Sequence, residues 1–173
     1  NDVRVNLLAY ALLQVWRQPL PVVLKERIMD PIGASTTWRW YGYDNSFVNV
    51  DGVMMQSISG GGHHGGGLFI NAEDQARFGL LFLRNGRWKD QQLISNTWIE
   101  SARTSSSANK DYGYMWWINN NRWKEVSPNI YFAAGFGGNY IVIDEANDLV
   151  VVTRWMDDAQ MGNFMRLVVT ACQ

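Results

Sequence analysis

Two strand-like segments near the end of the chain constrain its fold more than any other feature. Residues 139–143 and 149–154 are rich in β-branched and aromatic side chains, and a short polar connection, 144–148, joins them. A connection this short pairs the two segments as an antiparallel hairpin. A helix predicted over about 161–171 would then cover one face of the sheet that contains them.

The segments before this hairpin read mostly as helix and loop. Caps and apolar periodicity predict helices over about 2–17, 22–29, 71–84 and 95–102, and residues 34–58 are irregular or β with a turn at Asp51-Gly52. An aromatic strand is predicted over 112–118. We therefore expect an α+β fold in which an antiparallel sheet is flanked by helices, with residues 1–110 mainly helix and loop and 111–173 forming the sheet hairpins and the closing helix.

The first helix should be amphipathic and begins with Asp2 as an N-cap or first-turn acid. One face carries the apolar residues Val3, Leu7, Leu8, Ala11, Leu12 and Val15. This spacing is the periodicity of a helix. Because the pattern starts at the first residues, we expect a further segment to precede residue 1 in the natural protein.

Composition excludes several classes of function. The net charge is −1 and no basic block is present, which argues against a nucleic-acid-binding surface. No apolar run approaches the roughly 20 residues that a membrane span needs. The single cysteine, Cys172, excludes an internal disulfide framework and a Cys-rich zinc site. Two histidines without a His-Glu-x-x-His motif are too few ligands for a metal, so we expect no metal and no cofactor.

Both histidines, His63 and His64, lie in a glycine-rich loop over residues 59–67. Adjacent residues in an extended loop point to opposite sides, so at most one of them faces a given site. Two interpretations stay open: loop histidines bonded to backbone or water, and a histidine that lines a pocket. A phosphate cradle is disfavoured because no Gly-Lys-Ser/Thr sequence follows the glycines.

A second glycine cluster covers residues 133–139, directly before the first strand of the hairpin. Backbone N–H groups in such a segment can stabilise an oxyanion, and a β-bulge or turn explains it equally well. The nine tryptophans likewise fit either a thick aromatic core or an aromatic-lined pocket. The one Ser-x-x-Lys string, Ser107 to Lys110, lies in a solvated polar loop and is interpreted as chance.

Residues 65–83, GGGLFINAEDQARFGLLFL, resemble a segment of the serine β-lactamase-like hydrolases. That group includes class C β-lactamases, D-alanyl-D-alanine carboxypeptidases, family-VIII-type esterases and 6-aminohexanoate-dimer hydrolases. Three further segments are similar to the family in the same order: 86–95, 112–117, and 132–143 with 148–152. The resemblance implies that the chain is the C-terminal part of a single β-lactamase/transpeptidase-like domain, with part of its helical region.

The resemblance also implies where the catalytic groups lie. The family uses a Ser-x-x-Lys nucleophile, a Tyr-x-Asn-type motif and a Lys/His-Thr-Gly-type strand. The first would lie well upstream of residue 1, and the second would cross the start of the chain, with its tyrosine immediately before Asn1 and Asp2 at its polar third position. The nucleophile is therefore expected in an upstream segment, supplied in the same protein or as a separate chain.

The third motif corresponds to Ala133, Ala134 and Gly135, and the backbone N–H of Phe136 would be the strand-side oxyanion donor. Ala133 replaces the family's usual lysine or histidine, which binds a substrate carboxylate in penicillin-processing members. This departure favours an ester, amide or oligomer substrate without that carboxylate. The resemblance also places the glycine loop beside the substrate, so that His63 or His64 would line the cleft.

Two functional hypotheses follow. The first is a serine hydrolase that acts through an acyl-enzyme on an ester, amide or β-lactam-like substrate. This chain would contribute its oxyanion strand and cleft loops. The alternative is a non-catalytic module on the same scaffold that binds peptidoglycan or another glycan. Members of the family are often exported, so a periplasmic or secreted location follows from the resemblance alone.

Overall fold

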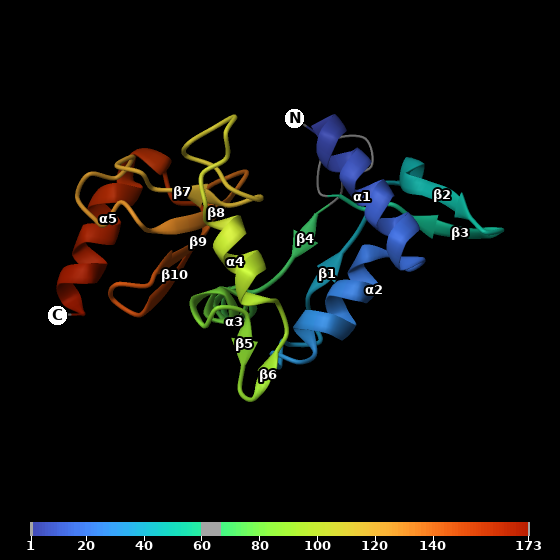
Figure 1. Ribbon diagram of the computed structural model, residues 1–173, viewed down its shortest axis with the longest axis horizontal. Helices are drawn as coiled ribbons and strands as arrows, with labels where there is room; N and C mark the ends of the chain where they lie inside the picture. The colour runs from blue at the N-terminus through green and yellow to red at the C-terminus, as the bar shows by residue number, and fades with distance from the viewer. Residues whose placement is uncertain (1, 60–66, 173) are drawn as a thin grey trace. The chain divides into compact units, whose positions relative to one another are not determined.

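The computed structural model describes residues 2–59 and 67–172, which divide into two compact units, Asn1–Asn71 and Ala72–Gln173. The architecture combines helices with small antiparallel sheets, so the predicted α+β class is confirmed (Figure 1). That the whole chain is one portion of a single domain, with its helical part ending near residue 110, stays a prediction.

The first unit begins with helices and continues with two short two-stranded sheets (Figure 1). Its elements are α1 (Asp2–Trp16), α2 (Leu20–Leu24), a π-helix (Lys25–Met29), β1 (Arg39–Trp40), a 3-10 helix (Asp44–Ser46), β2 (Phe47–Val50), β3 (Val53–Gln56) and β4 (Leu68–Phe69). β2 pairs with β3, and β1 pairs with β4, both antiparallel. The predicted turn between β2 and β3 is confirmed, because Asp51 and Gly52 both have positive φ.

The second helix differs in type from the prediction. It runs as α-helix only to Leu24 and then widens to a π-helix, in which the Asp30 N–H donates to the Lys25 carbonyl over 2.9 Å. Gly33, with φ of +70°, follows the end of the helix as expected for a C-cap glycine.

The predicted helix is confirmed as α1, but its apolar stripe is not its buried side. Ala9 and Leu13 are buried, whereas Val3, Leu7 and Val15 are 78%, 66% and 76% exposed. Among the described residues, the side that carries Ala9 and Leu13 is the one fully covered, so an apolar stripe stays open on α1.

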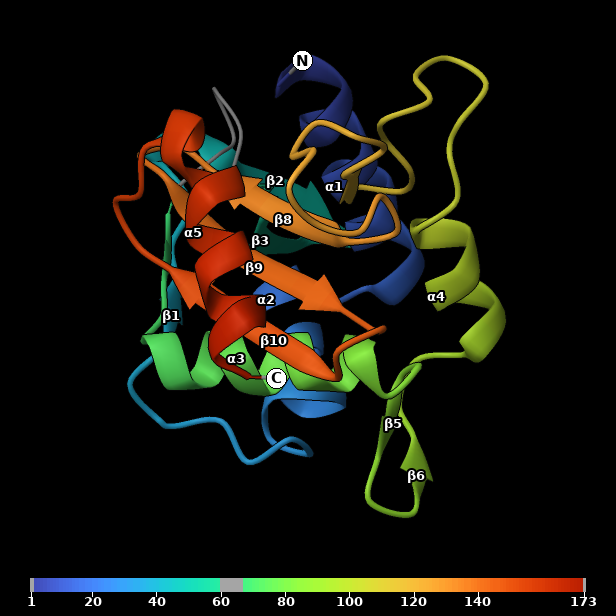
Figure 2. The ribbon, with the colours of Figure 1, turned by 90° about the vertical axis from the view of Figure 1, so that its left-hand side faces the viewer.

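The second unit is built around a four-stranded antiparallel sheet in the order β10-β9-β8-β7. Its elements are α3 (Ala72–Leu83), β5 (Arg87–Trp88), β6 (Gln91–Gln92), α4 (Asn96–Ala102), β7 (Trp117–Ile118), β8 (Tyr131–Gly135), β9 (Asn139–Asp144), β10 (Leu149–Thr153) and α5 (Asp158–Ala171). The predicted hairpin is confirmed as β9 and β10, and Figure 2 shows the predicted closing helix, α5, lying across the sheet.

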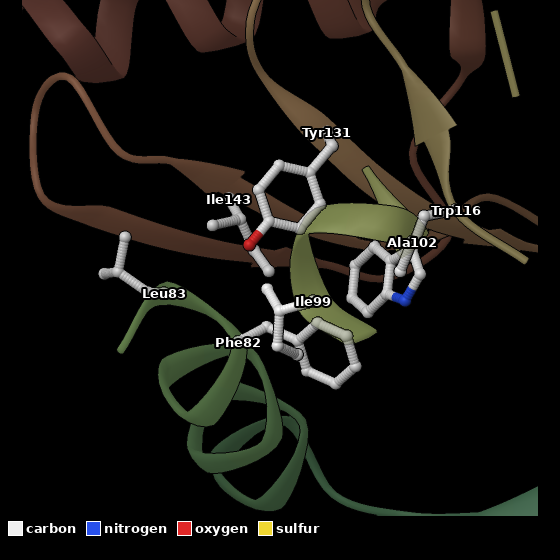
Figure 3. Close-up of a cluster of buried hydrophobic side chains, with 7 residues drawn as sticks. All are labelled: Phe82, Leu83, Ile99, Ala102, Trp116, Tyr131 and Ile143. Atoms are coloured by element: carbon white, nitrogen blue, oxygen red, sulfur yellow. The ribbon is translucent and has the colours of Figure 1, made fainter. Parts of the chain in front are cut away.

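Strict alternation along the strands gives the sheet two packed faces. Tyr131 and Ile143 point to a core shared with α3 and α4, where Figure 3 shows them meeting Phe82, Ile99 and Trp116. Phe132, Tyr140 and Val142 point to the opposite core, which Met161 and Met165 of α5 complete. Both cores are apolar and aromatic, so the sheet is fixed from two sides.

Gly79 explains why α3 can lie so close to this sheet. A Cβ at this position would be 2.5 Å from Val150 Cγ1 and 2.8 Å from Ile141 Cγ2. Only a residue without a side chain therefore permits the observed approach of α3 to β9 and β10.

The predicted strand over 112–118 is wrong for most of its length. Only Trp117 and Ile118 form a strand, and Tyr112 is joined to Trp117 by an isolated antiparallel bridge. The chain reverses between them, with Met115 at φ of 64° and the Gly113 N–H donating to the Trp116 carbonyl over 2.9 Å. The aromatic residues of this segment therefore form a tight turn, and their rings pack against different neighbours.

Candidate functional site

The carboxyl end of β8 is the part of the sheet that opens to solvent. Tyr131 and Phe132 are buried, Ala133 is half-buried, and Ala134 and Gly135 are exposed. β7 pairs only with the first two of these residues, so within the described chain the last three pair with β9 alone. The other edge of the strand is therefore free to hydrogen-bond to an extended ligand, and its side chains are too small to obstruct one.

A tight turn follows, over Phe136, Gly137 and Gly138. Both glycines have positive φ, +79° and +75°. The Gly138 carbonyl accepts a 3.0 Å hydrogen bond from the Met156 N–H, and a Cβ on Gly138 would be 2.1 Å from the Met156 carbonyl oxygen. The Asn139 amide Nδ2 closes the turn by donating to the Phe136 carbonyl over 2.8 Å. The turn is thus held by its own side chain and by the segment after β10.

Phe136 presents both its ring and its amide at this turn. Its side chain is fully exposed, and its N–H donates to no acceptor among the described residues. An N–H without a partner, at the end of an open strand edge, is a suitable donor to an anionic ligand oxygen.

A second exposed aromatic residue, Trp155, directly precedes the residue that hydrogen-bonds to this turn. Trp155, 82% exposed and at φ of 60°, precedes the Met156 that bonds Gly138. The Arg154 guanidinium carbon lies 5.6 Å from the centroid of its ring. The sequence prediction missed Trp155, because a tryptophan after a strand normally contributes to the core; nothing in the local pattern indicates its exposure.

The strand behind the turn is supported by a polar network. The Tyr140 hydroxyl donates to Asp158 Oδ1 over 2.8 Å, and an Arg122 Nη2 donates to Asp158 Oδ2 over 2.5 Å. Burial, together with the hydrogen bond to Asp158, raises the pKa of Tyr140 to about 12. Burial opposes ionisation of Asp158, but the bonds from Tyr140 and Arg122 hold its pKa below the usual value. Tyr140 is therefore a neutral donor rather than a base.

Burial likewise raises the pKa of Tyr131 far above its ordinary value. Neither tyrosine near the open strand can therefore accept a proton as phenolate at neutral pH.

The predicted site residues fall into three groups. Ala133, Ala134, Gly135 and Phe136 lie together at the end of β8. Asp2 is the first helical residue of α1, in the other unit. His63 and His64 lie outside the described residues.

Two other sequence observations concern possible catalytic or metal groups. The Ser107-to-Lys110 string lies in the loop after α4, so its two side chains do not share a helix face, as expected. Within residues 2–59 and 67–172, no three His, Cys, Asp or Glu side chains gather as a metal site would require.

No single described helix is both long and apolar enough to cross a membrane. One pair of helical segments, Val3–Trp16 and Leu20–Met29, passes the same test of length and composition together, with a bend of 71° between them.

The model of the beta-lactamase family matches residues 1–157. Two proteins named "Putative D-alanyl-D-alanine carboxypeptidase" are also similar: the one from Escherichia coli O157:H7 is 30% identical over 127 residues, and the one from strain K12 is 29% identical over 127 residues. Each alignment covers 70% of this chain and 27% of the relative, so the chain spans about a quarter of these relatives' length.

Solved structures show the same fold. A "Putative 6-aminohexanoate-dimer hydrolase" from Bacillus anthracis superimposes with a TM-score of 0.69 at 19% identity, over 96% of this chain and 41% of that one. A "putative beta-lactamase" from Bacteroides dorei gives a TM-score of 0.50 at 16% identity, over 86% of this chain and 48% of that one. The resemblance carried by the segment around Gly79 and by the β9–β10 hairpin is confirmed, and the chain belongs to the beta-lactamase family of serine hydrolases.

Proposed function

We propose that this chain is part of a serine hydrolase that cleaves an ester or amide through an acyl-enzyme. In this proposal the substrate's acyl part lies along the open edge of β8, and the Phe136 N–H is one donor to the oxyanion. The single observation that carries the proposal is this N–H, unpartnered among the described residues, at the end of an open strand of small residues.

The residues of the strand also limit the substrate. Ala133 and Ala134 carry no charge, so they offer nothing to pair with a substrate carboxylate at this position. The exposed rings of Phe136 and Trp155 instead favour an apolar group next to the reacting carbonyl. An uncharged ester or amide is therefore the substrate class that this part of the site would accept.

In this proposal the nucleophile comes from outside these 173 residues. We propose an upstream segment that supplies the serine, the lysine and the tyrosine, with Asp2 following the tyrosine and His63 or His64 at the rim of the cleft. The open apolar stripe on α1, with Val3, Leu7 and Val15, supports this proposal, because such a stripe is normally covered by further protein.

The test uses the protein expressed with all residues that precede Asn1 in its gene. We expect hydrolysis of p-nitrophenyl butyrate and covalent labelling by a fluorophosphonate, both lost together when the labelled serine is changed to alanine. A protein that neither turns over the ester nor takes the label would overturn the proposal and favour a ligand-binding module on the same scaffold.

A further inference from the structure

A hollow of about 530 Å³ lies beside α4 in the second unit, lined by residues that the proposed hydrolase site does not use. Its lining comes from one face of α4, with Thr97, Glu100 and Ser101, from the loop 104–107, and from Tyr114 before the edge strand β7. All of these residues carry hydroxyl groups except Glu100, which carries a carboxylate.

Close backbone packing builds this hollow. A Cβ on Gly113 would be 2.0 Å from the Ala102 carbonyl oxygen, so only glycine allows the chain to pass there. The Tyr114 N–H donates to that same carbonyl over 3.1 Å, and the Ser106 N–H donates to the Tyr112 carbonyl over 2.9 Å. The loop and Tyr114 are thereby fixed against the end of α4.

The hydroxyl groups of the lining present mainly acceptors. Ser101 donates to the Thr97 carbonyl over 2.8 Å, and Thr104 donates to the Glu100 carbonyl over 2.6 Å. In the loop, the Ser105 and Ser106 hydroxyls donate to backbone carbonyls over 2.6 and 3.0 Å. A hydroxyl has one hydrogen and two lone pairs, so each of these four can only accept from a ligand. The Ser106 hydroxyl also accepts from the Asn109 N–H over 3.1 Å, which leaves it one lone pair. The remaining hydroxyls of the lining, on Thr97, Ser107 and Tyr114, can accept as well as donate.

Glu100 adds a negative charge to this set of acceptors. Its Oε1 accepts a 3.0 Å hydrogen bond from Asn96 Nδ2, which orients the carboxylate. Of the described residues that line the hollow, Glu100 alone has an acidic side chain, and none has a basic one. A ligand with several donors, no acceptor and a positive charge complements such a lining best.

An aromatic wall stands next to the acceptors. The rings of Trp98 and Tyr114 stack with centroids 5.4 Å apart and planes 30° apart, and both side chains are about half exposed. Trp98 neighbours the lining residue Thr97, and Tyr114 itself lines the hollow. Exposed aromatic faces attract cations and cover apolar groups of a ligand.

We propose that this hollow binds a protonated primary amine attached to an apolar stem or ring. An ammonium group brings three donors, no acceptor and one positive charge. It therefore matches the Glu100 carboxylate and the four hydroxyls whose own hydrogens already bond to backbone carbonyls. The attached stem would lie against the Trp98–Tyr114 wall. Neutral alcohols and sugars bind less well, because they lack the charge and add acceptors that face other acceptors. This site is independent of the proposed hydrolase activity.

The test is calorimetric titration of the full chain with matched pairs of probes. Hexylammonium and cyclohexylammonium represent an apolar stem and an apolar ring, and n-hexanol and cyclohexanol are their neutral counterparts. We expect saturable binding of at least one amine with a Kd on the order of 1 mM, and at least about tenfold weaker binding of its neutral counterpart. The tighter amine identifies the stem. Equal binding of the neutral counterpart, or no binding of either amine, would overturn the proposal.

Variants connect the binding to the hollow. Glu100→Gln should weaken amine binding by roughly tenfold, and Thr104→Val, which removes one acceptor at nearly constant shape, by roughly threefold. The matched control is Glu73→Gln on α3, whose exposed carboxylate lies outside the hollow and should leave binding unchanged. Should Glu100→Gln not fold by circular dichroism, Thr104→Val decides. Unchanged binding in the folded variants contradicts the proposal.

Discussion

The Asn139 side chain donates to the carbonyl of Phe136 over 2.8 Å, and thereby closes the turn that presents the Phe136 N–H. The bond fixes the Phe136–Gly137 peptide, which directly follows the proposed oxyanion donor. Replacing Asn139 by alanine should reduce kcat for p-nitrophenyl butyrate by roughly tenfold, because the donor is no longer preorganised. Steady-state kinetics of the active protein measure this. Asn129→Ala, at an exposed position away from the turn, is the control and should have kcat close to the parent.

The two glycines of this turn should respond differently to alanine. Gly138 needs both a positive φ and an empty Cβ position, since Met156 O would lie 2.1 Å away. Gly137 needs only the positive φ, because its nearest contact would be Asn139 Nδ2 at 3.8 Å. Urea unfolding should show Gly137→Ala destabilised by about 1 kcal/mol and Gly138→Ala by about 3 kcal/mol or more. Equal losses would mean that the contact with Met156 is unimportant.

Gly79 tests the packing of α3 on the sheet in the same way. An added methyl group would meet Val150 and Ile141 at 2.5 and 2.8 Å, so Gly79→Ala should lower the free energy of unfolding by about 1–3 kcal/mol. In a Val150→Ala background, Gly79→Ala should lower the free energy of unfolding by less than it does in the parent, because the closer of the two contacts is already removed. Unfolding in urea measures both, and a strictly additive double variant would contradict the close contact.

Local signals explain how much of the fold the sequence could predict. The β9–β10 hairpin and most of α5 were predictable because strand propensity, a short connection and helical periodicity act between near neighbours. The cap at Asp157 was missed, so α5 begins at Asp158 and not at about 161. The turn at Met115 was not, because the Gly113 approach to Ala102 depends on α4, which lies apart in the sequence. The exposure of the stripe on α1 could not be predicted either, because apolar periodicity shows which face is apolar and not whether protein covers it.

The same difference between local and long-range interactions applies to the candidate site. That Ala133 to Phe136 lie together was predictable because they are contiguous in the chain, and their role at a site stays a prediction from the resemblance. Trp155 could not, since its contribution depends on the bond between Met156 and Gly138, a contact that forms only when β10 returns beside β9. The exposure of Trp155 therefore depends on this long-range contact and could not be predicted from the residues around it.

Tyr140 should make stability fall at alkaline pH. Its pKa is about 12 in the folded protein, above the ordinary value of about 10, so between these values the unfolded chain releases a proton that the folded chain retains. The contribution is therefore fully present below about pH 10 and is lost as pH rises towards 12. Urea midpoints from pH 8 to 11.5 should fall less steeply in Tyr140→Phe than in the parent. Tyr43→Phe, at an exposed position, should keep the parent slope.

The proposed oxyanion donor is the backbone N–H of Phe136 and not its side chain, so a substitution can remove the ring and keep the donor. Phe136→Ala keeps the N–H and removes the exposed ring, so kcat for p-nitrophenyl acetate should stay within about threefold of the parent. For longer acyl esters, such as the octanoate, KM should rise by roughly three- to tenfold, since an apolar contact is lost. Trp155→Ala should act in the same direction if both rings border the acyl group, and the exposed Trp98→Ala, in a different part of the unit, is its matched control. A large loss of kcat on the acetate in Phe136→Ala would mean that the ring, and not the amide, does the chemistry at this turn.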